Sequence, residues 1–369
     1  MCKSSSGALA PTASRRRSRS SSSAATAAAS FSAATSSGPD RQTTNTSNTT
    51  TSSTSSRSSR SSLAAARASL PPPPLLYPFH ELTAATNGFL AKRDASSTYW
   101  RCSLRGRDAA LFQLRALPGL TRADASAALA RTARYHHASL APLLGACLAG
   151  PHVYLAYSHP PAAASLAACL LRSSTSILGT WLSRVQVAAD VAQGLDYVHT
   201  HADAVHGRVS PSTVLLVPDP DGLRASLTHF GADQFAQPDA AAAQSDSDVH
   251  AFGLLLLQLL SGEAEASRFR FDRATKEFAT VSVLDTAAEA LATGRVRTWV
   301  DRRLGDSFPV AAAEKLLEVG LRCASPDDRP PPEMSWVAGK VSKAYVESRA
   351  WARQLQHSDG LSSVSLAPR

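Results

Sequence analysis

The sequence predicts an α+β fold in which a small strand-rich part precedes a larger, mostly helical part, behind a disordered N-terminal tail. Hydrophobic residues make up 44% of the 369 residues, but much of that is alanine and aromatic residues make up only 6%. The core is therefore expected to be mainly helical. Apolar and polar residues alternate within residues 98–114, as in strands. Within residues 181–199, apolar residues recur at helical spacing.

The first 76 residues are expected to be a disordered basic tail that ends in a proline-rich spacer. Residues 1–68 are rich in Ser, Thr, Ala and Arg and have almost no large apolar side chain. Such a segment buries too little surface to offset the entropy lost on ordering. Residues 1–70 carry nine basic side chains and one acid, which is +8 of the chain's net charge of +9. The four prolines at 71–74 predict a stiff spacer.

Three interpretations of this tail stay open. An Arg- and Ser-rich, acid-poor segment is typical of a plastid transit peptide. The tail also fits a membrane-proximal arm, with Cys2 acylated and the basic residues 15–19 on anionic lipid. The third interpretation is a solvated tail that serine kinases phosphorylate. The protein is accordingly expected in the cytoplasm, either free or attached to the plasma membrane through Cys2 and the basic tail, or alternatively in the plastid.

Composition argues against several classes of protein. Five scattered cysteines without C-x-x-C spacing indicate a reducing compartment rather than a disulfide framework or a zinc site. No run approaches the roughly 18 apolar residues of a membrane-spanning helix. The histidines lack acid or thiol partners at ligand spacing, so no metal site is expected. Because the excess charge lies in the tail, we expect no binding of nucleic acid.

The strand-rich part is expected to begin near Tyr77. Two stretches with a period of two, joined by a turn at residues 105–108, predict a β-hairpin. No glycine occurs between Gly88 and Gly106, and Lys-Arg-Asp-Ala-Ser-Ser fills positions 92–97. The strands and the helix expected here cover residues 98–104, 109–114, 120–135 and 153–157. Beyond them we expect helices at 181–199 and 333–356, with the domain ending near residue 350 and a polar tail at 351–369.

Several segments match one family in the right order. Residues 206–216 read His-Gly-Arg-Val-Ser-Pro-Ser-Thr-Val-Leu-Leu, which resembles the H-R-D-L-K-P-x-N-I-L-L catalytic loop of protein kinases. Further matching segments lie at residues 79–89, 137–147, 194–199, 247–253 and 321–330. Together they resemble the kinase domain of plant receptor-like kinases, most closely the LysM-type kinases and their inactive relatives. The resemblance implies a two-lobed protein-kinase-like fold, with an N-lobe at about 77–157 and a C-lobe at about 158–350.

The catalytic positions of the family do not match. The resemblance places Arg208 where the catalytic-base Asp belongs, Ser210 where a Lys belongs and Thr213 where the Mg²⁺-binding Asn belongs. His229 replaces the Asp of the D-F-G element, which bridges Mg²⁺ to the phosphates. A neutral imidazole binds that hard cation poorly.

The nucleotide-binding positions do not match either. By register, Gln113 stands where the Lys of the third strand belongs, and Ala128 stands where its partner Glu belongs on the following helix. Neither charge of that ion pair is then left buried alone. In the family a glycine-rich loop lets the backbone approach the phosphates, and the glycine-free positions 92–97 replace it here.

The packing positions of the family do match. These structural positions are His206, Phe230, Gly231, Asp248 and Arg329. Preserved packing with degenerate chemistry predicts an inactive pseudokinase that acts as a binding or scaffold module in signalling and needs no cofactor. The alternative is a divergent active Ser/Thr protein kinase that uses ATP. The expected partner is an active receptor-like kinase or another signalling protein.

Overall fold

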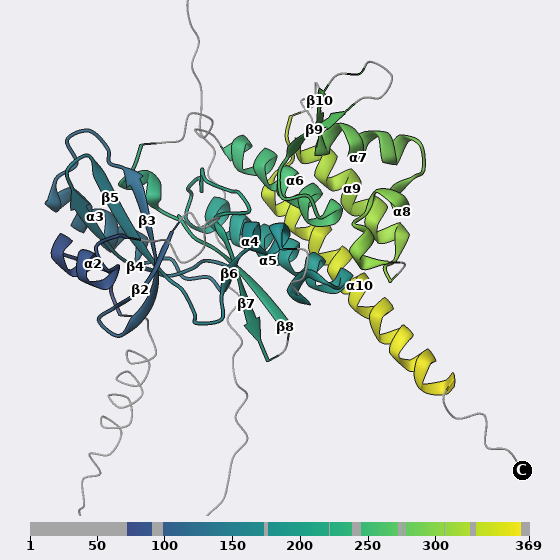
Figure 1. Ribbon diagram of the computed structural model, residues 1–369, viewed down its shortest axis with the longest axis horizontal. Helices are drawn as coiled ribbons and strands as arrows, with labels where there is room; N and C mark the ends of the chain where they lie inside the picture. Colours follow the sequence, from purple (N-terminus) through teal and green to yellow (C-terminus); the bar gives the residue numbers. More distant parts are fainter. Residues whose placement is uncertain are drawn as a thin grey trace, which may run out of the picture. The chain divides into compact units, whose positions relative to one another are not determined.

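The computed structural model describes residues 72–90, 99–172, 176–220, 222–237, 245–271, 276, 278–305, 307–324 and 330–362. For Ser176 and for residues 245–247, 268–271 and 356–362 it describes the backbone alone. The tail with Cys2, the stretch 92–97 and Arg329 lie outside the described residues. A small sheet-containing lobe precedes a mostly helical lobe (Figure 1), so the predicted two-lobed α+β fold is confirmed.

The N-lobe, residues 72–158, is built on a five-stranded sheet with the order β1-β4-β5-β3-β2. Neighbouring strands are antiparallel, except that β1 runs parallel to β4. The helix α2 contacts β2 and β4, and the helix α3 contacts β4 and β1. The elements of this lobe are β1 (Leu75–Leu76), α2 (Phe79–Ala85), β2 (Trp100–Leu104), β3 (Arg107–Arg115), α3 (Arg122–Thr132), β4 (Leu143–Ala149) and β5 (His152–Ser158).

The strands β2 and β3 form the predicted hairpin, with a turn shorter than expected. Leu104 pairs directly with Arg107, so only Arg105 and Gly106 make the turn. Both residues have positive φ, 52° and 74°, which is the backbone geometry of a tight two-residue hairpin turn. The turn fixes the register of β3 and with it the face on which each β3 side chain lies.

The C-lobe consists of helices, a small three-stranded sheet of order β6-β7-β8 and a separate hairpin, β9-β10. The helix α5 packs against α10 and β8, and α6 packs against α9. Its helices are α4 (Leu166–Leu171), α5 (Trp181–His201), α6 (Ser245–Ser261), α7 (Val283–Ala292), α8 (Val296–Trp299), α9 (Val310–Ala324) and α10 (Met334–Ser362). Its strands are β6 (Ala164–Ser165), β7 (Val214–Asp219), β8 (Gly222–Leu227), β9 (Ser267–Phe271) and β10 (Phe278–Ser282). Three 3-10 turns complete it, η1 (Ser176–Leu178), η2 (Ala232–Gln234) and η3 (Arg302–Leu304).

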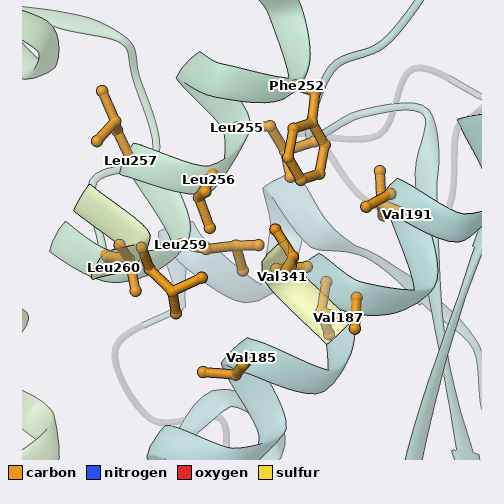
Figure 2. Packing of buried hydrophobic residues seen from close by; sticks show 14 of the residues in the cluster. Val185, Val187, Val191, Phe252, Leu255, Leu256, Leu257, Leu259, Leu260 and Val341 are labelled. Atoms are coloured by element: carbon orange, nitrogen blue, oxygen red, sulfur yellow. The ribbon is translucent and has the colours of Figure 1, made fainter. Parts of the chain in front are cut away.

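The core of the C-lobe lies where α5, α6 and α10 meet. Figure 2 shows valines of α5 facing Phe252 and the leucines of α6, with Val341 of α10 among them. The side chains labelled there are all buried. The apolar run at residues 252–260 is therefore a core helix, and within the described ranges no helix is long and apolar enough to cross a bilayer.

The predicted helices are present, but their ends differ from the expected ones. The helix expected at 120–135 is α3, which is shorter at both ends, and the one expected at 181–199 continues two residues further as α5. The final helix, α10, continues to Ser362. The domain end expected at residue 350 thus falls inside a continuous helix.

Candidate functional site

The segment between α5 and β7 is anchored by Asp248 of α6. The Asp248 carboxylate is buried, and it accepts hydrogen bonds from the backbone N–H groups of His206 and Gly207, both at 2.7 Å. His199 of α5 lies 2.9 Å from the same carboxylate through Nε2. These contacts hold the segment on the C-lobe, as the resemblance implies for Asp248.

His206 fixes the same segment from its other side. The ring is buried and its Nε2 donates a hydrogen bond of 2.8 Å to the carbonyl of Thr228, next to His229. Its Nδ1 accepts from the backbone N–H of Arg208 at 3.3 Å. Burial lowers the pKa of His206, so the neutral ring has a structural role in this position.

Arg208, Ser210 and Thr213 make contacts within the protein. The Arg208 guanidinium donates a hydrogen bond to the carbonyl of Gln237. The Thr213 hydroxyl lies 2.8 Å from the Arg208 carbonyl and accepts a 3.0 Å hydrogen bond from the Ser210 N–H. The hydroxyl therefore stabilises its own loop.

Within the described part of the chain, no three His, Cys, Asp or Glu side chains come together as metal ligands.

His229 lies in an apolar, aromatic environment. Its backbone has a φ of 70°, and its ring lies 4.4 Å from that of Phe112 and 5.7 Å from that of Tyr157. Its Nδ1 lies 2.8 Å from the Thr228 hydroxyl. Burial, together with the nearby His206 and Arg208, lowers the pKa of His229 to about 3. The ring is therefore neutral at physiological pH and contributes no charge to this site.

Five side-chain rings pack in a continuous cluster beneath the N-lobe sheet. We call them the ring cluster: Tyr99, Phe112, Tyr157, His159 and His229. The Tyr99 ring lies 5.1 Å from that of Phe112 and 5.4 Å from that of His159. The Phe112 and Tyr157 rings are 6.0 Å apart. None of the five residues is more than 5% exposed, so their side chains fill the space between the N-lobe sheet and the turn at His229.

The comparisons with known proteins agree with this architecture. A leucine-rich repeat receptor-like serine/threonine-protein kinase of Arabidopsis thaliana is 28% identical over 300 residues, which cover 74% of this chain and 33% of that protein. Chitin elicitor receptor kinase 1 of the same plant is 27% identical over 256 residues, which cover 63% of this chain and 40% of that protein. The chain thus spans less than half the length of either relative. No protein-family model matches it.

A solved structure shows the same fold. The pseudokinase domain of BIR2, described as an immune regulator of the RLK/Pelle family, matches with a TM-score of 0.57 at 21% identity. The match covers 76% of this chain and 89% of that one. The chain is a relative of plant receptor-like kinases. Its domain has the protein-kinase-like fold that the sequence predicts.

The structure corrects one position of this receptor-like kinase relative by a single residue. Side chains alternate along β3, so that Ala110 and Phe112 belong to the apolar cluster that contains Ala128 of α3. Gln113 lies on the opposite face of the strand and is exposed. Phe112 therefore stands where Gln113 was expected, because a shift of one residue reverses the face of every side chain in a strand. The sequence analysis did not place Phe112 on this face of β3. The tight turn at residues 105 and 106, which sets the register of the strand, is the signal that could have done so.

Ala128 lies in α3, which forms within the helix predicted at residues 120–135. It is buried in α3, in the same apolar cluster as Phe112. An aromatic ring and a methyl group therefore belong to one apolar cluster between this strand and helix. No charge is left buried at this point, which avoids the cost of an unpaired ion in a low-dielectric interior.

Phe230 and Gly231 complete the turn after His229. The Phe230 carbonyl accepts a hydrogen bond of 3.3 Å from the Tyr157 hydroxyl, and its ring meets that of Tyr135 edge-on at 5.9 Å. Gly231 has a φ of 78°, and a Cβ at this position would lie 2.6 Å from Oγ1 of Thr132. Both the backbone conformation and the close approach of α3 therefore require glycine.

An open cavity is lined in part by Phe230 and by none of the residues of the ring cluster. It has a volume of about 670 Å³, and the end of α3, the start of β4 and residues 72–74 form its walls. Its lining includes Tyr135, Leu140 and Phe230, but none of Arg208, Thr213 or His229. The hollow is therefore separate from the positions at which the family performs its chemistry.

Proposed function

We propose that this receptor-like kinase relative is a pseudokinase, a protein-binding module in signalling that transfers no phosphate. The ring cluster carries the proposal. The rings of Tyr99, Phe112, Tyr157, His159 and His229 are packed against one another. A nucleotide bound beneath the N-lobe sheet would have to displace buried rings and forgo their packing, which costs free energy.

The charges needed for phosphoryl transfer support the same proposal. The reaction depends on positioning the phosphates and on neutralising the charge that develops on them. Phe112 replaces the expected cation, His229 is uncharged, and the Thr213 hydroxyl is used within its own loop. Arg208 adds a cation at the position of the catalytic base. Since these groups act as a unit in the family, restoring one of them is not expected to restore activity.

The proposed partner is an active receptor-like kinase. A domain that lacks the chemistry but retains the two-lobed fold offers mainly its surface for binding. The Ser- and Thr-rich tail offers such a kinase many hydroxyl groups, and phosphorylation would reduce the tail's charge of +8 and alter its contacts. We further propose that Cys2 and the basic residues 15–19 attach the protein to an anionic membrane.

The nucleotide part of the proposal is tested by thermal unfolding of the full chain. We expect millimolar ATP to leave the midpoint unchanged, with or without Mg²⁺, because a ligand stabilises a protein only if it binds the folded state. Matched samples with MgCl2 alone correct for ionic effects. A stabilisation that requires both ATP and Mg²⁺ would overturn the proposal and favour the divergent active kinase.

The partner part is tested by co-purification from plant tissue, with the full chain compared with a chain that lacks residues 1–71. We expect the full chain to recover a receptor-like kinase and to carry phosphate on the Ser or Thr residues of its tail, as mapped by mass spectrometry. Recovery of no kinase, together with an unphosphorylated tail, would contradict the signalling role. Release from membranes by Cys2→Ser or by high salt would support the proposed anchor.

A further inference from the structure

The residues that follow the turn at Gly231 are built into the N-lobe. Phe235 and Ala236 are fully buried, with 0% exposure. They belong to the same apolar cluster as Phe112 of β3 and Ala128 of α3. Residues 232–237 continue the chain from the C-lobe strand β8, so a segment of C-lobe origin supplies part of the N-lobe core.

Backbone hydrogen bonds join this segment to the last residue of β3 and to the chain just beyond it. The N–H of Gln237 donates to the carbonyl of Arg115 at 2.9 Å, and the N–H of Leu117 donates to the carbonyl of Phe235 at 2.9 Å. Between them, Ala116 forms an antiparallel bridge with the segment. The 232–237 segment is thus paired with the N-lobe as a short strand would be.

Side chains fasten the segment to both lobes. On the N-lobe side, Arg131 of α3 donates a hydrogen bond of 2.9 Å to the Gln234 side chain, and the Gln237 side chain donates to the carbonyl of Ala116 at 3.2 Å. On the C-lobe side, the Arg208 guanidinium donates to the Gln237 carbonyl. A single residue, Gln237, therefore bonds to the end of β3 and to the loop that Asp248 anchors.

We infer that residues 232–237 act as a built-in clasp that holds the N-lobe and the C-lobe in one fixed arrangement without any ligand. Phe235 supplies the apolar contact, the backbone of Gln237 supplies the link to β3, and Arg208 supplies the link to the C-lobe. This assigns a structural role to Arg208, which stands where the resemblance places the catalytic base. A charge-assisted hydrogen bond to a carbonyl is a suitable anchor because it is stronger than a neutral one.

The clasp has a consequence for recognition. A partner that contacts both lobes would meet a surface whose two halves are already in place. Preorganisation of this kind lowers the entropic cost of association. The inference goes beyond the proposed function and does not depend on it, because the clasp would hold the lobes in the same way whether or not a partner exists.

Hydrogen–deuterium exchange of the full chain tests the contact of Phe235. We expect Phe235→Ala to accelerate amide exchange in β3 and α3 by about tenfold, because the N-lobe loses a core side chain and opens more often. The amides of α6 and α9 should keep their wild-type protection. The matched control is Phe278→Ala, which removes the same ring from a side chain that is 72% exposed and should change nothing in the N-lobe.

A second variant tests the C-lobe anchor without touching the N-lobe core, so the inference stays testable even if Phe235→Ala fails to fold. Arg208→Ala should accelerate exchange at the amides of Gln237 and Leu117, which donate across the clasp, again by about tenfold. Its matched control is Arg295→Ala, at a guanidinium that is 64% exposed.

Two results would overturn the clasp. One is wild-type protection of the Gln237 and Leu117 amides in Arg208→Ala. The other is an equal acceleration of exchange in both lobes of Phe235→Ala, which would indicate general destabilisation. Neither measurement involves a nucleotide or a partner protein. A result that overturns the clasp would therefore leave the proposed pseudokinase function untouched.

Discussion

The Asp248 carboxylate contacts three polar groups at the site. Its two oxygens accept hydrogen bonds from the N–H groups of His206 and Gly207, and His199 adds a third contact. We predict that Asp248→Asn lowers the free energy of unfolding by about 1–3 kcal/mol, because the amide nitrogen cannot accept from a buried N–H group. Chemical denaturation at neutral pH measures the change.

The exposed Asp203 provides the matched control. Its φ of 47° is positive, and Asn tolerates this conformation as well as Asp does. Asp203→Asn should therefore leave the denaturation midpoint unchanged. An unchanged midpoint for Asp248→Asn as well would show that the anchor at Asp248 contributes little, and that the likeness to the family is misleading at this position.

His229 predicts a pH dependence of stability. Its pKa is about 3 in the folded protein against an ordinary value of 6.5, so between these pH values the unfolded chain binds a proton that the folded chain does not. The free energy of unfolding should therefore fall as the pH falls below about 6.5, with a contribution from His229 of roughly 1–2 kcal/mol by pH 5.

A comparison of slopes isolates this contribution. His229→Asn removes the titrating ring and retains a side chain that tolerates positive φ. Burial also lowers the pKa of His206 and of His159, so the variant should keep part of the pH dependence. We expect it to lose less stability than the wild type between pH 7 and pH 5. Equal losses in the two proteins would show that His229 is not held neutral by the fold.

At the scale of elements, Gly231 determines how closely α3 approaches the turn after His229. Gly231→Ala would place a Cβ 2.6 Å from the Thr132 hydroxyl at a φ of +78°. Gly294→Ala offers a matched control, since its φ is +64° and no atom lies within 4 Å of the added Cβ. We predict a loss of about 1 kcal/mol for Gly294→Ala from backbone strain alone.

Gly231→Ala should lower the free energy of unfolding by roughly 1–3 kcal/mol more than Gly294→Ala does, because the added methyl group overpacks the contact with Thr132. Thr132→Ala in the same chain should recover part of the loss, and a double-mutant cycle of denaturation measurements gives the coupling. Equal losses for the two glycine variants would mean that α3 moves aside at little cost.

The hairpin of β2 and β3 shows how far sequence patterns determine this fold. Alternation and the glycine turn predicted both strands, and the structure differs mainly in the length of the turn. That small difference matters at Phe112. The predicted turn spanned four residues, and the observed turn spans two. The Lys of the family was expected at Gln113, whereas it is Phe112, one residue earlier, that shares an apolar cluster with Ala128. A register error of one residue is invisible in a strand's composition but reverses its faces.

The ring cluster and the 232–237 segment were beyond sequence reasoning for a different reason. Tyr99, Phe112, His159 and His229 come from four separate places in the chain, and no local period links them. Phe235 likewise lies in a short Ala-containing stretch without a helical or strand pattern. Their contacts are tertiary, so they follow from the packing of the two lobes and not from local propensity. By contrast, Asp248 and His206 were found because they occur within recognisable motifs.

At the scale of the whole molecule, apolar or neutral side chains meet between the N-lobe sheet, α3 and the turn after β8. Phe112 and Ala128 share one apolar cluster, and neutral His229 packs against Phe112. These side chains are compatible with one another, because the apolar groups and the neutral ring are in contact. A charge introduced at one of these positions would therefore be buried without a partner, which is strongly unfavourable.

This consistency gives the last prediction. A variant with Thr213→Asn, Arg208→Asp and His229→Asp restores the residue types that the family uses for the base and the Mg²⁺ ligands. We expect it to transfer no phosphate from ATP to a generic protein substrate, because Tyr99 and Phe112 still occupy the space beneath the sheet and no cation replaces Phe112. We also expect a lower denaturation midpoint than in the wild type, since the carboxyl group introduced by His229→Asp would be buried among rings.

The matched control carries Thr213→Asn, Arg208→Ala and His229→Asn, which changes the same three positions without adding an acid. Circular dichroism establishes that both variants are folded, and transfer of labelled phosphate measures activity. The acidic variant should match the control in transfer and fall below it in stability. Measurable transfer by the acidic variant alone would show that nucleotide reaches the site despite the rings, and it would contradict the role proposed for the ring cluster.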